Sequence, residues 1–390
     1  MYVSTTPQVQ EQRLSEEHAA LVKATLPAVG ENVEAIARTF YEKLFTAHPE
    51  LLRDTFNRGN QKTGAQQKAL AASVATFATM LVDPEAPDPV NMLSRVAHKH
   101  VSVGITEDQY PVIHEHLMAG IGEVLGDAVT DDVAEAWSAV YWLMAEVLVD
   151  QEKGLYASDD VKPGEVFREV TVTDKQSLTE NVTTYTLQGD LVKPRPGQYT
   201  SIGVVLPDGA RQLRQYSIVA GNEHFYRIAV ETNGEVSNHL KEKVDAGDTI
   251  QATLAAGDLV LEDGDNPVVL ISSGIGSTPI IGMLAYLTRT QSDRRVTCLV
   301  ADENEASLAQ KAEGDSFVEQ LKNASVFFSY RDHGEMLKPS EYDVAGADVY
   351  ICGGSAFLKS VRDDLENLPA DQAPAKIQYE MFSPNDWLVN

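Results

Sequence analysis

The hydrophobic pattern divides the chain into three regions. From residue 15 to 155, long runs repeat apolar residues three and four positions apart, with Pro and Gly between them, which predicts helices. A polar segment with Pro and Gly, residues 157–165, is followed by short alternating runs, which predict strands up to about residue 255. From residue 266, continuous apolar runs alternate with helical segments, as in a parallel sheet.

This order predicts a multidomain protein with an all-α domain, then an antiparallel β-barrel, then an α/β doubly wound domain. The expected boundaries are residues 13–155, 163–264 and 265–390. A chain of 390 residues commonly holds two or three domains, and a hydrophobic fraction of 43% suits packed globular domains.

Charge and cysteine content narrow the class of partner. The formal net charge of −27 repels nucleic acid and anionic membrane surfaces, so neither is expected as a partner. The two cysteines, Cys298 and Cys352, both lie in apolar strand-like runs, which favours a reducing compartment. The polar N-terminus does not look like a signal peptide, and no apolar run is long enough to span a bilayer. We therefore expect a cytoplasmic protein.

The segment VVLISSGIGSTPIIGMLAYL, residues 268–287, predicts a strand, a glycine turn and a helix. Gly274 and Gly276 would let the backbone approach a pyrophosphate at the N-terminus of that helix. Pro279 stands where the usual fingerprint has a third glycine. A second strand ends in small residues at Ile351–Gly354, where an open α/β sheet binds its ligand. An ordinary strand-to-helix turn is the alternative for each segment.

The barrel region contains RPGQY at Arg195–Tyr199, RQYS at Arg214–Ser217 and GEVSNHL at Gly234–Leu240. In such a short strand, an arginine can pair with a phosphate, a tyrosine offers an aromatic face for stacking, and a serine offers a hydroxyl for hydrogen bonding. The backbone N–H groups of Val236, Ser237 and Asn238 could open a helix against a pyrophosphate. With SGIGSTP and ICGG further on, these motifs resemble the ferredoxin–NADP reductase family.

That resemblance implies FAD in the barrel and NADH or NADPH in the α/β domain. Tyr199 and Tyr216 would lie near the flavin, Arg214 at its phosphates, Ser217 near its reactive nitrogen, and Phe382 over its ring. The expected cofactor-binding residues of the two domains are Tyr199, Arg214, Gln215, Tyr216, Ser217, Val236, Ser237, Asn238, Gly274, Ile275, Gly276, Ser277, Thr278, Pro279, Cys352, Gly353, Glu380, Met381, Phe382, Ser383 and Pro384. In ADENEAS, Asp302 and Glu303 have no nearby arginine and weakly favour NADH, although a solvated acidic loop explains them nearly as well.

The helical region contains SRVAHKHVSVGI, residues 94–105, with two histidines. On a helix, His100 shares a narrow arc with Leu93, Val96, Ala97 and Gly104, whereas His98 points sideways. Such a histidine is usually a core residue. However, Tyr41 lies on an apolar helix face, Phe56 precedes a turn, and Gln66 shares a stripe with Leu70 and Phe77. One His, one Tyr, one Gln and several aromatic residues would suit a haem pocket.

The segments VKATLP, FYEKLF, FNRGNQKTGAQQKAL and AHKHVSVGI resemble those of bacterial flavohaemoglobins, as does the order of the domains. The resemblance covers nearly the whole chain and implies haem b, with His100 as the proximal iron ligand. It implies a distal Tyr41 that hydrogen-bonds dioxygen, a distal Gln66, and Phe56 packed on the haem. Tyr110 and Glu152 would orient the proximal imidazole. Lys99 and Glu380 match positions that tune redox potentials. Gly354 and the MFSP at Met381–Pro384 depart from the family pattern.

The function implied is that of a nitric oxide dioxygenase, an NAD(P)H-dependent oxidoreductase that turns NO and O2 into nitrate with electrons passed through FAD to haem. No obligate protein partner is expected. Two alternatives stay open. One is an NAD(P)H-driven reductase of peroxides, quinones or ferric compounds, and the other is an oxygen-binding or oxygen-sensing globin. His98, His114 and His116 are expected to be exposed or edge residues.

Overall fold

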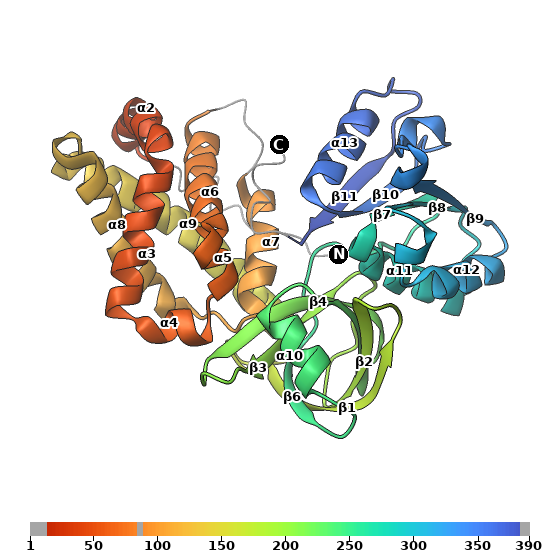
Figure 1. The fold of residues 1–390 in the computed structure, drawn as a ribbon. Coiled ribbons are helices and arrows are strands. Elements are labelled where there is room, and N and C mark those ends of the chain that lie inside the picture. The colour runs from red at the N-terminus through yellow and green to blue at the C-terminus, as the bar shows by residue number, and fades with distance from the viewer. Residues whose placement is uncertain (1–13, 84–88, 383–390) are drawn as a thin grey trace.

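The computed structural model describes residues 14–83 and 89–382, which form three domains in chain order (Figure 1). A helical domain comes first. A closed antiparallel barrel follows, and a parallel sheet flanked by helices ends the chain. The predicted fold class is therefore confirmed.

The helical domain is built around one apolar core that includes the fully buried Phe40, Leu44, Phe77 and Trp137. At Gly120, an added Cβ would lie 3.2 Å from the carbonyl oxygen of Ile36, so α3 and α8 pack backbone against backbone. The helices are α2 (Glu16–Glu31), α3 (Val33–Ala47), α4 (Pro49–Asp54), α5 (Arg58–Thr63), α6 (Ala65–Val82), α7 (Pro89–Val101), α8 (Tyr110–Leu125) and α9 (Asp131–Ser158), with short 3-10 turns η1 (Glu107–Gln109) and η2 (Gly126–Ala128).

The barrel closes in the order β1-β2-β5-β4-β3-β6, so each strand has a neighbour on both sides. Alternate residues of each strand fill its interior, among them Leu187, Ile202 and Ile228. Its elements are β1 (Phe167–Ser177), β2 (Val182–Gln188), β3 (Tyr199–Val205), β4 (Arg211–Gly221), β5 (Phe225–Glu231), α10 (Glu235–Lys243) and β6 (Thr249–Thr253).

The third domain has a five-stranded parallel sheet in the order β11-β10-β7-β8-β9. Its central strands β7 and β10 are buried along almost their whole length because helices cover both faces. Its elements are β7 (Val268–Ser273), η3 (Gly274–Gly276), α11 (Ser277–Arg289), β8 (Val296–Asp302), η4 (Glu305–Ser307), α12 (Lys311–Gln320), β9 (Ala324–Tyr330), η5 (Arg331–His333), η6 (Pro339–Glu341), β10 (Asp348–Gly353), α13 (Ser355–Glu366) and β11 (Lys376–Met381).

Helix α7 faces the barrel and the parallel-sheet domain (Figure 1). It ends at Val101, so Gly104 is not on the helical arc that the sequence predicted. Gly104 instead has φ +77°, and an added Cβ would lie 2.8 Å from the ring of Phe167 at the start of the barrel. In residues 14–83 and 89–382, no helix is both long and apolar enough to cross a lipid bilayer.

Candidate functional site: a histidine pocket beside a two-domain reductase

Three helices bring together His100, Tyr110 and Glu152. Nδ1 of His100 lies 2.7 Å from Oε1 of Glu152 and 3.1 Å from the hydroxyl of Tyr110. The Tyr110 hydroxyl donates to the same Glu152 oxygen at 2.5 Å. The three side chains predicted for the proximal side are thus in mutual contact.

The carboxylate of Glu152 is buried, at 2% exposure, and its contact with His100 identifies Nδ1 as the protonated nitrogen. Burial and the neighbouring Glu152 raise the pKa of Tyr110, so this hydroxyl stays protonated and donates. With the proton on Nδ1, Nε2 is the nitrogen whose lone pair could bind a metal. A neutral imidazole whose other nitrogen is held by a carboxylate is the donor arrangement of a metal-ligating histidine, so the residues fit a haem iron.

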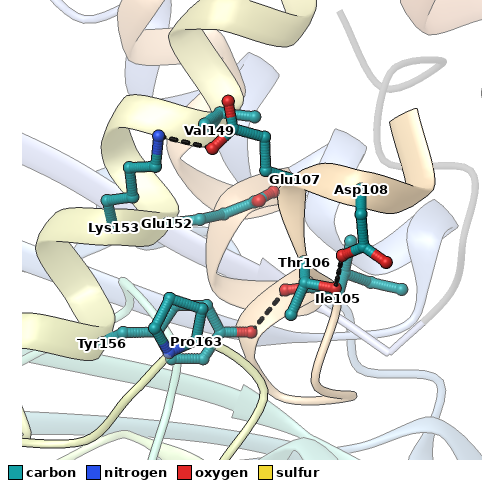
Figure 2. A pocket seen from close by; sticks show the side chains of 9 residues that line it. All are labelled: Ile105, Thr106, Glu107, Asp108, Val149, Glu152, Lys153, Tyr156 and Pro163. Atoms are coloured by element: carbon teal, nitrogen blue, oxygen red, sulfur yellow. Dashed lines mark hydrogen bonds and ion pairs between the residues drawn. The ribbon is translucent and has the colours of Figure 1, made fainter. Parts of the chain in front are cut away.

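A cavity of about 480 Å³ lies behind Glu152, between α9 and the segment before α8 (Figure 2). Tyr156 closes one side of it and donates its hydroxyl to the carbonyl of Ile105 at 2.6 Å. Lys153 and Glu107 form an ion pair of 2.6 Å among the lining residues. Glu152, which contacts His100, therefore also lines a cavity.

On α3, Tyr41 is buried in an aromatic cluster. Its ring stacks on Phe45 with centroids 5.4 Å apart and meets Phe56 edge-on at 5.8 Å. Burial raises the pKa of Tyr41, and its hydroxyl hydrogen-bonds the side chain of Gln61 on α5. Gln61 was not predicted. Gln66, which was, lies on α6, but its side chain is outside the described residues.

Helix α7 also carries contacts to the barrel and the parallel-sheet domain. Lys99 donates to Gln215 on β4, so two predicted cofactor residues from different domains meet. Arg95 donates to the carbonyl of Tyr379 at 2.6 Å and stacks on its ring. The backbone N–H of Gly257 donates to Nδ1 of His98 at 3.1 Å. The helix that holds His100 therefore touches both of the other domains.

The prediction that His98, His114 and His116 are exposed or edge residues agrees with the structure only in its second form, because none of the three is exposed. All three are half-buried. His98 is part of the domain interface, His114 hydrogen-bonds the hydroxyl of Ser138 at 2.8 Å, and His116 donates to the carbonyl of Val112. Helical periodicity missed His98 because its partner is 159 residues away in the barrel.

The predicted flavin residues lie on the paired strands β3 and β4. Tyr199 is directly opposite Ser217, and Thr200 is opposite Tyr216. An added Cβ on Gly257 would lie 2.9 Å from the ring of Tyr199, so a glycine is required there for that ring to keep its place. Arg214, largely buried, meets Glu235 of α10 at 3.1 Å. Aromatic rings, a hydroxyl and an arginine thus converge, as a flavin nucleotide requires.

The start of α10 fits a pyrophosphate, with one correction. An added Cβ on Gly234 meets nothing within 4 Å, so the space before the helix is open. Val236 and Ser237 belong to the first turn, whose N–H groups have no helical partner. The N–H of Asn238 instead donates to the carbonyl of Gly234 at 2.9 Å, so the prediction that it binds a cofactor through this group is wrong.

The C-terminal strand β11 places Glu380 beside Cys352 of β10. Met381 accepts a hydrogen bond from the hydroxyl of Ser355 at 3.0 Å, and the ring of Phe382 that follows is about half exposed, at 52%. An exposed ring at a strand end suits a stacking role. Ser383 and Pro384 lie outside the described residues.

The glycine turn after β7 has the predicted strand, turn and helix form. Gly274 has φ +57°, and an added Cβ on Gly276 would lie 2.5 Å from the carbonyl oxygen of Cys352 and 2.8 Å from the amide of Gly353. The hydroxyl of Thr278 donates to the carbonyl of Ile275 within the turn, whereas the hydroxyl of Ser277 donates to the side chain of Gln310, just before α12. Ile275 is the middle residue of this turn, and Pro279 is the third residue of α11.

In the acidic loop after β8, Oδ1 of Asp302 accepts from the backbone N–H of Glu303 and from the hydroxyl of Ser307. Glu303 forms an ion pair of 2.8 Å with Arg331. The sequence inference that no arginine lies near Glu303 is therefore wrong, since Arg331 arrives from the end of the next strand. The preference between NADH and NADPH stays a prediction.

Fold and site together define a globin joined to a two-domain flavin reductase module. The Globin family matches residues 38–148. The chain is 36% identical to a flavohemoprotein of Deinococcus radiodurans, over 95% of this chain and 98% of that protein, and 32% identical to one of Bacillus subtilis, over 93% and 96%. The crystal structure of flavohemoglobin from Malassezia yamatoensis, with bound FAD and heme, superposes with a TM-score of 0.88 at 31% identity, covering 95% of this chain and all of that one. The chain belongs to the flavohemoprotein family.

Proposed function

We propose that this protein is an NAD(P)H-dependent nitric oxide dioxygenase that holds haem b, FAD and a pyridine nucleotide. One NAD(P)H, two O2 and two NO give NAD(P)+, two nitrate ions and one proton. When bound, FAD supplies hydride acceptance and single-electron release, and haem supplies an iron that binds diatomic gases. The observation that carries the proposal is the contact of His100 with Glu152 and Tyr110 on a helix that also contacts the reductase domains.

On the proximal side, Glu152 fixes the tautomer of His100 and makes the imidazole a more electron-rich ligand. Tyr110 holds the carboxylate in place and shares its charge. On the distal side, the Tyr41 hydroxyl offers a hydrogen bond in an apolar cluster, where it stabilises negative charge on a diatomic ligand without reorganisation. A diatomic ligand would thus be polarised from the proximal side by His100 and from the distal side by Tyr41, which suits an attack by NO.

On the reductase side, Arg214, Val236 and Ser237 would hold the FAD phosphates, and Gly274 and Gly276 the nucleotide pyrophosphate. The contact of Lys99 with Gln215 supports electron passage within one chain, so no protein partner is proposed. A cytoplasmic location is proposed from the two free, buried thiols, Cys298 and Cys352.

The test is nitrate formation by the purified protein supplied with NADH, NO and air, with NADH omitted as the control. The proposal expects two nitrate ions for each NADH oxidised, because a hydride carries two electrons. His100→Ala separates the alternatives. A dioxygenase loses nitrate formation in this variant, whereas a flavin reductase of quinones or ferric compounds keeps its main activity. An oxygen-binding or sensing globin forms no catalytic nitrate even as the wild type.

A further inference from the structure

Arg58, the first residue of α5 in the helical domain, reaches into the barrel. Its Nη1 lies 2.6 Å from a carboxylate oxygen of Asp208, in the turn between β3 and β4, and its Nη2 lies 2.9 Å from Oε2 of Glu235. The backbone N–H of Arg58 donates to Oε1 of Gln212, which is 1% exposed. The same Gln212 side chain donates to the carbonyls of Arg53 and Phe56. The chain at residues 53–58 is therefore fixed on β4, and the guanidinium is held half-buried at the domain interface.

Glu235 stands between two arginines of different domains. Its Oε2 meets Arg58, and its Oε1 meets Nη2 of Arg214 at 3.1 Å. Arg214 also donates from Nη1 to Gln212, so both arginines share two neighbours. Arg214 is the residue proposed to meet the FAD phosphates, and Glu235 lies in the first turn of α10, which faces the same phosphates.

A carboxylate in that position opposes FAD binding unless its charge is balanced. The pyrophosphate of FAD is anionic, and Glu235 sits on the guanidinium and on the helix end that would receive it. Once the FAD phosphates pair with Arg214, Glu235 loses part of its interaction with that arginine. Arg58 is then the cation that still neutralises Glu235. The helical domain therefore supplies a charge that the flavin site of the barrel lacks on its own.

We propose that Arg58 completes the FAD site from the globin domain by neutralising Glu235, so that FAD affinity depends on the docked position of α5. This inference rests on the proposed FAD site. Arg58 acts as a positioning residue, through Glu235 and Arg214, and not by contact with the flavin. Because binding coupling is reciprocal, bound FAD in turn strengthens the hold on α5, which also carries Gln61, the partner of Tyr41.

The test is the dissociation constant of FAD, measured by quenching of flavin fluorescence on the full-length, haem-loaded protein after FAD removal. We expect Arg58→Gln to weaken FAD binding by about fivefold or more. Glu235→Gln keeps an acceptor for Arg214 and should bind FAD at least as tightly as the wild type. In the Glu235→Gln background, Arg58→Gln should change the constant by less than about twofold, because no carboxylate is left to neutralise.

Lys43→Gln is the matched control, because it removes an equal charge from the same domain and because Lys43 pairs with Glu123 of α8 within that domain. An unchanged haem absorption band shows that each variant is folded. Equal FAD affinity of Arg58→Gln and wild type overturns the inference, as does a full Arg58 effect that persists without Glu235. A wild-type protein that binds no FAD would instead overturn the proposed function.

Discussion

Oε1 of Glu152 on α9 lies 2.7 Å from Nδ1 of His100 on α7. The two residues are 52 positions apart, and the same oxygen accepts a hydrogen bond from Tyr110 at 2.5 Å. A buried carboxylate that serves one imidazole and one phenol fixes the orientation of the ring and adds electron density to it. In the proposed haem site, we therefore expect the reactivity of the iron to depend on a residue that does not touch it.

Glu152→Gln keeps the shape of this side chain but removes its charge. The reduction potential of the haem should rise, because a carboxylate stabilises the more positive ferric state, and nitrate formation should fall by about tenfold. Spectroelectrochemical titration of the haem measures the potential. Tyr110→Phe, which leaves the carboxylate in place, should shift it less. An unchanged potential in Glu152→Gln would contradict the role given to this residue.

Tyr41→Phe removes the distal hydroxyl and leaves the aromatic cluster nearly unchanged in volume. Loss of one hydrogen bond of about 1–1.5 kcal/mol should make dioxygen leave the ferrous protein roughly five to ten times faster. Stopped-flow displacement of dioxygen by carbon monoxide measures this rate. Tyr156→Phe is the matched control, because that hydroxyl donates to the carbonyl of Ile105 and its ring belongs to a different apolar cluster from Tyr41. Equal rates for Tyr41→Phe and wild type would remove Tyr41 from the proposed mechanism.

The pattern of the chain predicted the order of domains and the strand–turn–helix at Gly274 and Gly276, because these depend on local periodicity. The contact of His100 with Tyr110 and Glu152 followed only from the family resemblance, since no single helix shows it. The domain interface was missed. Its hydrogen bonds join residues more than 100 positions apart, and several of them use backbone groups, so no spacing rule reveals them. Examples are the bonds of Gln212, Glu235 and His98.

Gly276→Ala should impair use of the pyridine nucleotide while leaving the haem intact. The new Cβ would lie 2.5 Å from the carbonyl oxygen of Cys352, so the turn and β10 must separate. We expect destabilisation of about 1–3 kcal/mol and a roughly tenfold higher KM for NADH. Steady-state reduction of an artificial acceptor measures KM. Gly122→Ala on α8, where a Cβ meets nothing within 4 Å, should leave both quantities unchanged or raise stability slightly. A normal KM in Gly276→Ala would place the nucleotide elsewhere.

We expect His98 to make the domain interface sensitive to pH. Nδ1 can accept from the N–H of Gly257 only while it is unprotonated. Burial lowers the pKa of His98 below its usual value. The negative charge of Asp258 opposes this shift, and the positive charge of Arg195 adds to it. Arg95 also faces this group, through its ion pair with Asp258. The contribution of this contact to docking is therefore complete above about pH 6.5 and is lost as the pH falls below that value through the lowered pKa.

The protection of the Gly257 amide against hydrogen exchange, corrected for the intrinsic rate at each pH, measures this contact directly. It should fall below about pH 6.5 in the wild type. His98→Asn supplies an amide oxygen in place of Nδ1 and does not titrate, so protection should stay level. A parallel fall in both proteins would assign the pH dependence to another group.

The central claim is that electrons reach the haem on His100 from FAD within the same chain. Anaerobic stopped-flow mixing with NADH tests it most directly, with flavin and haem absorption followed together at several protein concentrations. The account predicts that the flavin is reduced first, and that the haem is then reduced at a rate independent of protein concentration. Haem reduction that scales with protein concentration, or a haem that stays ferric while the flavin is reduced, would contradict it.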